Sequence, residues 1–190
     1  MNEKVPVPQR QIRAHHTETT IRVYQAYAPE IAGPALTAGT FVAPFKRERM
    51  TWIKPSFRWM AYRCGWAAKP GQERVLAIDI TREGFEWALG NASLSHGDVD
   101  KSQPVRIQWD PERDLHHRPL GHRSIQIGLS RQACELYVDK WITNLTDITE
   151  TMTTIGAYVR ANRLPEAAAL LPAESPYEVP AELAKAINLS

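Results

Sequence analysis

The amino-acid sequence predicts an α+β protein, with a mixed, mostly antiparallel sheet and helices packed against it. Segments with strand-like alternation and segments with helical periodicity follow one another without the regular order that a doubly wound parallel sheet requires. The chain has 190 residues, 43% of them hydrophobic, which suffices for one domain with its own core. We expect a basic N-terminal arm over residues 1–19, a single globular domain over 20–163 and a proline-punctuated tail with a short helix over 164–190.

The first half of the chain carries short strands and helices with clear end signals. The segment TIRVYQAY is rich in β-branched and aromatic residues and alternates along its length, which predicts a strand. Two prolines frame a short helix that ends at Gly39, and a second helix opens at Pro55 and stops at Gly65. The expected elements are strands at 20–27 and 50–54 and helices at 29–39 and 55–64.

The second half begins with the segment ERVLAIDI, which predicts another strand. Thr81 is a suitable N-cap for the helix that follows, and Gly90 would end that helix. A polar loop is expected over 91–103. The remaining expected elements are strands at 73–80, 105–109 and 124–129, helices at 82–89 and 131–142, the latter capped by Ser130, a helix from Asp147 to about 162, and a short helix near Pro180.

Basic and aromatic residues gather between Phe41 and Arg74. This stretch holds eight Lys or Arg residues, two Glu residues and three of the six tryptophans, although the net charge of the whole chain is only +2. Aromatic rings beside guanidinium and ammonium groups suit stacked, anionic ligands such as nucleotides. The alternative is that Trp52, Trp59 and Trp66 form core and that the bases are solvated.

The segment MTWIKPS favours the ligand-binding interpretation. Arg49, Thr51, Lys54 and Ser56 crowd a turn that precedes the second predicted helix. The start of a helix offers free backbone N–H groups and a positive dipole to a phosphate.

Several common site types lack support in the sequence. The motifs GxGxxG, GxxxxGKS/T, GxSxG and HExxH do not occur. Cys64 and Cys134 are far apart and are expected to be buried and reduced. Adjacent histidines, as at 15–16 and 116–117, point to opposite sides of an extended segment, so no metal site is expected. The N-terminus has no apolar signal core and no run could span a membrane, which predicts a cytoplasmic protein without membrane partners.

Two later segments carry candidate site residues. The expected loop after residue 109 brings Asp110 and Glu112 to the end of a strand, where scaffolds often hold catalytic groups. A turn with surface ion pairs is the alternative. In the strand at 124–129, the residues Ser124, Gln126 and Gly128 share a face that suits close approach of a ligand or simple exposure to water. Arg123 lies on the opposite face.

The chain resembles the bacterial and fungal domain-of-unknown-function family 4291. The resemblance spans about residues 9–145 and leaves out the C-terminal tail, and the family has no established activity. The matching segments are RQIRA, VYQAY, RERMTWIKPSFRWMAYR, KPGQERVLAI, IQWDPERDL and RSIQIGL.

A more distant similarity is to ADP-ribosyltransferases, whose first strand carries a Tyr and a basic residue that hold NAD, and whose late strand often carries Glu. The comparison implies that VYQAY is the first strand and SIQIGL the late strand of such a fold. Gln25 stands where the basic residue is expected and Gln126 where Glu is expected. The missing Glu argues against transfer to protein acceptors and leaves transfer to nucleic acid or a small molecule, or simple binding.

The resulting hypothesis is an enzyme that binds NAD or a related nucleotide as substrate and transfers ADP-ribose. The basic residues and the helix end at Ser56 would hold phosphates, the aromatic residues would stack on rings, and the amides would orient the ribose or nicotinamide. The residues assigned to binding are Tyr24, Gln25, Arg49, Trp52, Lys54, Ser56 and Arg123, and those assigned to catalysis are Gln126, Asp110 and Glu112. The alternatives are a non-catalytic module for single-stranded RNA or DNA and an interaction domain with a structural tryptophan core.

Overall fold

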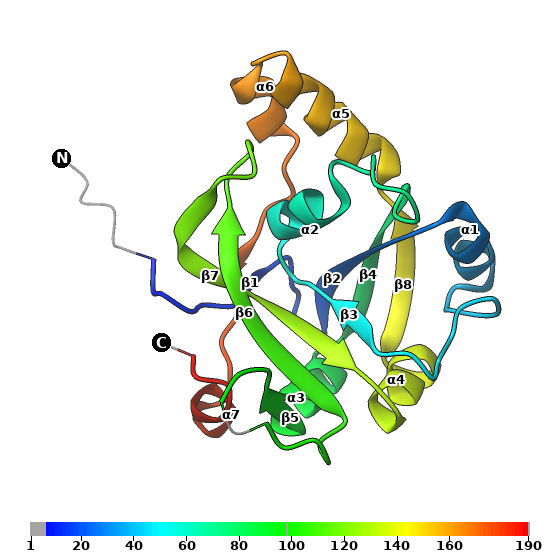
Figure 1. The fold of residues 1–190 in the computed structure, drawn as a ribbon, viewed down its shortest axis with the longest axis vertical. Helices are drawn as coiled ribbons and strands as arrows, with labels where there is room; N and C mark the ends of the chain where they lie inside the picture. The colour runs from blue at the N-terminus through cyan, green and yellow to red at the C-terminus, as the bar shows by residue number, and fades with distance from the viewer. Residues whose placement is uncertain (1–6, 98, 190) are drawn as a thin grey trace.

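A computed structural model describes residues 7–97 and 99–189 of the chain. It confirms the α+β class, with mostly antiparallel sheets and packed helices in one body (Figure 1). The strands are β1 (Arg13–Ala14), β2 (Thr20–Tyr27), β3 (Thr51–Ile53), β4 (Arg74–Thr81), β5 (Ala92–Leu94), β6 (Val105–Arg113), β7 (Pro119–Leu129), β8 (Ile142–Asp147) and β9 (Ser175–Pro176). The helices are α1 (Pro29–Ala38), α2 (Phe57–Cys64), α3 (Arg82–Gly90), α4 (Gln132–Leu136), α5 (Thr149–Arg160), α6 (Leu164–Ala169) and α7 (Ala181–Ala186).

The first sheet has the strand order β2-β4-β8 and is antiparallel throughout. Strands β2 and β4 pair over their full lengths, from Thr20 opposite Thr81 to Tyr27 opposite Arg74. Strand β8 was not expected from the sequence, which placed these residues partly in a helix. It forms because β4 offers a second edge, and pairing there satisfies backbone N–H and C=O groups of both strands.

The second sheet has the order β3-β7-β6-β5. The long antiparallel hairpin of β6 and β7 crosses the front of the molecule in Figure 1. Both strands are longer than predicted, so Asp110 lies within β6 and the expected carboxylate loop was wrong. The register shifts between Pro111 and Arg113, where the strand bulges. The expected loop over 91–103 also contains β5, which pairs in parallel with β6.

The two sheets meet where β2 passes β3. The Tyr24 backbone N donates to the Lys54 carbonyl at 2.8 Å, which is the bridge between the sheets. Helix α2 follows β3 directly and packs on β2 and β6 (Figure 1). The end of β3 therefore lies where the two sheets and α2 come together.

The ends of α2 and α3 follow the predicted signals closely, whereas the predicted cap Ser130 was wrong, because Arg131 precedes α4 and no side chain caps it. Thr81 caps α3 by accepting a hydrogen bond from the Gly84 backbone at 3.1 Å, and Gly65 ends α2 in the left-handed conformation at φ 60°. Helix α2 begins at Phe57 with Ser56 as its N-cap, two residues later than predicted, since the Ser56 hydroxyl accepts from the Trp59 backbone at 3.1 Å.

The helix predicted over 131–142 is shorter and less regular than expected. It starts as α4 at Gln132, continues as a π-helical turn over Tyr137–Trp141, and gives way to β8 at Ile142. The π-helical turn leaves Tyr137 and Trp141 buried, so side-chain packing decides the local backbone here.

The two ends of the described chain lie side by side. Strand β1 pairs with β9, and Ile12 is fully buried in the main core. Helix α6 was not anticipated, whereas α7 begins at Ala181, next to the predicted start near Pro180. The segment from α6 to β9 therefore packs along the domain.

A substitution at Gly84 tests how closely α3 packs against the π-helical turn. A Cβ atom at Gly84 would lie 2.3 Å from Cγ of Trp141, so we expect Gly84→Ala to lower the free energy of unfolding by about 1–3 kcal/mol. The control is Gly33→Ala within α1, whose Cβ would meet no atom within 4 Å, and which should stabilise by up to about 1 kcal/mol. Urea unfolding measures both, and equal stability of the two variants would contradict the observed packing.

Candidate functional site

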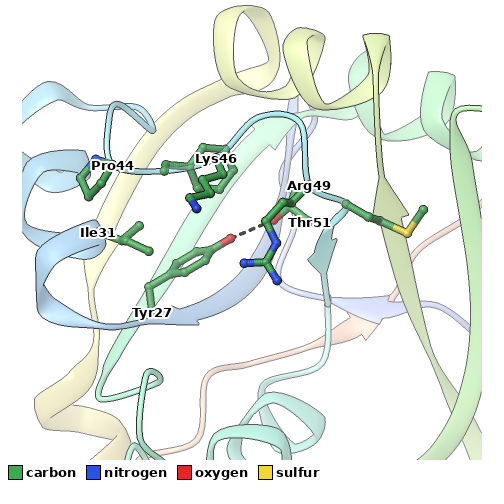
Figure 2. Close-up of a pocket in the computed structure, with 8 residues that line it drawn as sticks. Tyr27, Ile31, Pro44, Lys46, Arg49 and Thr51 are labelled. Atoms are coloured by element: carbon green, nitrogen blue, oxygen red, sulfur yellow. Dashed lines mark hydrogen bonds between the residues drawn. The ribbon is translucent and has the colours of Figure 1, made fainter.

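Two adjacent hollows lie beside β3 and the loop that precedes it. The first, of about 240 Å³, lies between α1, the loop and β3, and Figure 2 shows Tyr27 and the Arg49 guanidinium facing the same space. The second, of about 230 Å³, lies between β2, β3 and α2. Tyr27, Met50 and Thr51 line both hollows. We call the two hollows together the basic groove.

Four cationic side chains line the basic groove: Lys46 and Arg49 in the first hollow, and Lys54 and Arg63 in the second. No acidic residue is among the described residues that line either hollow. Lys46, Arg49 and Arg63 are exposed, whereas Lys54 is buried. The groove therefore carries uncompensated positive charge, which attracts anions.

Gln25 forms the wall between the groove and the core. Its amide nitrogen lies 2.6 Å from the Thr51 hydroxyl and 3.0 Å from the Tyr27 hydroxyl, and donates to the Trp52 carbonyl at 3.1 Å. Its amide oxygen accepts from the Tyr137 hydroxyl at 2.7 Å. This network holds Tyr27 and Thr51, which also contact each other at 2.8 Å, in fixed positions at the junction of the two hollows.

Lys54 is the buried cation of the groove. Its Nζ donates to the Trp52 carbonyl at 2.9 Å and lies 5.6 Å from the centre of the Trp59 ring. Burial, helped by the charge of Arg63, lowers the pKa of Lys54 from 10.5 to about 7, although the charge of Asp110 opposes the change. The amine thus loses or gains a proton near neutral pH.

Asp110 and Gln126 meet on neighbouring strands. Gln126 donates to one Asp110 carboxylate oxygen at 2.7 Å, and Gln108 donates to the other at 2.9 Å. Two amides thus hold the carboxylate in one orientation without neutralising its charge. The sequence assigned Asp110 and Gln126 separately, and the structure brings them together on the half-buried face of the β6–β7 hairpin.

The face of β7 on which the sequence predicted a ligand or water is covered at Gly128 by side chains of the protein. A Cβ atom at Gly128 would lie 2.7 Å from Met50 Sδ and 2.9 Å from Trp52 Cζ2. The absence of a side chain at Gly128 therefore lets Trp52 lie on β7, between the basic groove and the strand that carries Gln126.

Six of the ten assigned residues do not line the basic groove: Asp110 and Gln126, described above, and Tyr24, Ser56, Glu112 and Arg123. The N-terminus of α2, which the sequence assigned to phosphate together with Ser56, holds a carboxylate of the chain itself, because the Phe57 backbone donates to Glu174 at 2.8 Å. Glu112 is 5% exposed and lies near Glu174. Burial raises the pKa of Glu174 to about 7, and the charge of Glu112 adds to the rise. Tyr24 is buried under α2, and Arg123 lines a different hollow.

The tryptophans of the basic stretch serve packing more than the sequence analysis anticipated. Trp59 and Trp66 are 5% and 8% exposed, and the Trp66 ring stacks on His117 at a centroid distance of 5.1 Å. Tyr62 lies within cation–π distance of both Arg113 and Lys69. These contacts hold the tip of the β6–β7 hairpin against α2. They also cover ring faces that could otherwise stack on bases.

The residues assigned from the sequence left out Tyr27, Phe45, Lys46 and Arg63, which line the groove. A signal for Tyr27 was available, because residues 25 and 27 share a face of an alternating strand. Arg63 belongs to the basic stretch, but its place in the groove depends on how α2 packs.

The chain belongs to the family described as Domain of unknown function (DUF4291), whose model matches residues 11–177. The predicted family is therefore confirmed, and the match extends to residue 177, beyond the expected limit near residue 145. No curated protein matches the chain.

No group of three or more His, Cys, Asp or Glu side chains is arranged to hold a metal ion in the described residues. No helix in that part of the chain is long and apolar enough to cross a membrane.

The lowered pKa of Lys54 predicts a pH-dependent contribution to stability. Between about pH 7 and pH 10.5 the unfolded chain binds more protons at Lys54 than the folded chain does, so the free energy of unfolding should rise with pH. Relative to a Lys54→Met variant, the slope should reach at most about 1.4 kcal/mol per pH unit. Urea unfolding of both proteins at pH 7, 8 and 9 measures the difference, and a constant or falling difference would contradict the buried position of the amine.

Proposed function

We propose that the protein binds a nucleotide in the basic groove, with NAD as the first candidate. The observation that carries the proposal is the lining of the groove, which has four cations and no acidic side chain among its described residues. Phosphate groups compensate such charge, and Arg side chains bind them through paired N–H donors.

The shape of the groove supports a ligand of nucleotide size. Each hollow alone is smaller than the roughly 300–1,000 Å³ typical of small-molecule sites, but they adjoin at Tyr27 and Thr51. Phe45 and Tyr27 offer ring surface in the first hollow, and Trp52 offers it in the second. A ligand with a ring at each end and phosphates between them would match this alternation of aromatic and cationic side chains.

The proposal includes ADP-ribose transfer, with Asp110 as the proton acceptor. Asp110 lies outside the lining of both hollows, and its charge acts on Lys54, which lines the second. The bond between the ribose C1′ and the nicotinamide nitrogen would break, and its electron pair would neutralise the ring nitrogen. A nucleophilic oxygen or nitrogen of the acceptor would bond to C1′ and lose its proton to Asp110. Gln126 and Gln108 support this role, since their amides orient the carboxylate.

The packing of Trp59 and Trp66 favours a small nucleotide over single-stranded nucleic acid, because binding of a strand relies on several free ring faces. A cytoplasmic location is part of the proposal. It is supported by Cys64 and Cys134, which are both free and buried.

A substitution of Arg49 tests whether the basic groove binds a nucleotide. Arg49 is exposed and lines the first hollow, so Arg49→Gln should leave the fold intact and remove a charge-assisted contact worth about 1.5–3 kcal/mol. We expect NAD to raise the melting temperature of the wild type and to bind the variant about 10- to 100-fold more weakly, as measured by calorimetric titration.

The matched control is Arg160→Gln, which removes the same charge from the exposed end of α5. This variant should bind NAD as the wild type does. If NAD, ADP-ribose and ATP all leave the wild-type melting temperature unchanged, the protein does not bind nucleotides and the proposal fails.

Asp110→Asn separates binding from chemistry. Asparagine keeps the shape and can still accept the Gln126 hydrogen bond, but it cannot take up a proton. NAD affinity should stay within about twofold, and nicotinamide release should fall by roughly 10²–10⁴-fold, as measured by chromatography of the reaction mixture. Unchanged nicotinamide release by the variant would remove Asp110 from the mechanism, and a wild type that binds NAD without releasing nicotinamide would leave only the binding function.

A further inference from the structure

Lys54 is a buried amine beside a cavity, and the proposed transfer of ADP-ribose uses it only as a cation. Its side chain is 6% exposed and lines the second hollow of the basic groove, which has a volume of about 230 Å³. A lysine is seldom this buried, because its ammonium group loses hydration. Enzymes whose lysine forms a Schiff base with a carbonyl compound use the same burial to keep the amine reactive.

The contacts of the Lys54 amine leave it able to react. Its Nζ donates to the Trp52 carbonyl at 2.9 Å, and this hydrogen bond fixes the direction of the group. No ion pair joins Lys54 to a carboxylate within the described residues. A neutral amine has two N–H groups and one lone pair. The Trp52 carbonyl engages one N–H group, so the lone pair stays free to attack a carbon atom.

Three ionisable groups act on Lys54 from the elements around it. The guanidinium of Arg63 on α2 adds to the effect of burial and lowers the pKa of the amine, whereas the Asp110 carboxylate on β6 and the Cys64 thiol raise it. The lowering prevails, and the pKa of Lys54 is about 7. Near neutral pH about half of the Lys54 amines are therefore neutral, against fewer than about one in 10³ of ordinary exposed lysines.

The rest of the second hollow suits a small anionic ligand. Arg63 is exposed, lines the hollow with Lys54, and forms no ion pair in the part of the chain that the structure describes. Its guanidinium can bind a phosphate through paired N–H donors. Trp52 and Met60 add apolar surface to the lining. A compact ligand with one phosphate needs only this hollow, whereas a dinucleotide needs both.

We propose that Lys54 forms a Schiff base with a small phosphorylated aldehyde bound in the second hollow. The Lys54 nitrogen bonds to the carbonyl carbon, the carbon–oxygen double bond breaks, and the oxygen leaves as water with both protons of the amine. The product has a C=N double bond to Nζ, and the step needs no oxidant or reductant. This chemistry goes beyond ADP-ribose transfer and does not require that the groove binds a nucleotide.

Treatment of the wild-type protein with pyridoxal phosphate at pH 7, followed by sodium borohydride and peptide mapping by mass spectrometry, tests the proposal. Borohydride reduces the C=N bond to a stable secondary amine, which identifies the labelled lysine. The internal control is Lys140, which is exposed on the π-helical turn. At a low ratio of reagent to protein, Lys54 should be labelled at least about tenfold more than Lys140, because more of its amine is neutral.

Pyridoxal, which lacks the phosphate, and the variant Arg63→Gln test how the anion is recognised. We expect pyridoxal to label Lys54 about tenfold less than pyridoxal phosphate does, since it lacks a charge-assisted contact. Loss of Arg63 also changes the pKa of Lys54, so the ratio of labelling by the two reagents is compared. Arg63→Gln should bring this ratio close to one, whereas Arg160→Gln should leave it unchanged. Thermal melts establish that both variants are folded.

The proposal is overturned if the wild type carries no adduct at Lys54, or if Lys54 is labelled no more than Lys140. Equal labelling of Lys54 by pyridoxal and pyridoxal phosphate would overturn the phosphorylated aldehyde as the ligand. NAD is absent from these reactions. An adduct at Lys54 in a protein that binds no NAD would therefore support this inference and refute nucleotide binding, and NAD binding without an adduct would do the reverse.

Discussion

The buried amide of Gln25 is the interaction on which the arrangement of the two sheets depends. It joins β2 of the first sheet to Thr51 and Trp52 of the second, and it accepts from Tyr137 of the π-helical turn. A buried amide is costly unless its donors and acceptor are satisfied, and here three separate segments must be in place to satisfy it. The same network positions Tyr27 and Thr51, so the condition for a stable junction of the sheets also shapes the groove.

This use of Gln25 changes the meaning of its position on the first strand. The similarity to ADP-ribosyltransferases implied a residue that contacts the nucleotide directly. In the structure its amide oxygen and nitrogen are engaged by Tyr137, Thr51, Tyr27 and the Trp52 carbonyl. Gln25 therefore acts on any ligand in the groove through the side chains it holds, and because an amide is neutral it leaves the nearby cations uncompensated.

Local patterns predicted those elements that have local causes. The strand at 20–27 alternates, α3 has a threonine cap, and α2 ends at a glycine, and each lies within two residues of its expected limits. Strand β8 escaped prediction because its mostly exposed residues show no strict alternation and it exists only by pairing with β4. For the site, the charge of the stretch located the groove, but Glu174 occupies the α2 N-terminus from 117 residues away, which no local pattern could show.

The buried ammonium group of Lys54 is unfavourable for the folded state. A buried charge raises the free energy of the folded state unless an opposite charge or several hydrogen bonds compensate it. The Lys54 ammonium has one carbonyl at 2.9 Å and a tryptophan ring, so its pKa falls to about 7 and the amine can respond by losing its proton. A phosphate in the groove would add to the charge of Asp110, which alone does not offset the burial of Lys54, and would favour the protonated amine. Anion binding and protonation of Lys54 are therefore linked, and the groove should hold anions more tightly as the pH falls toward 7.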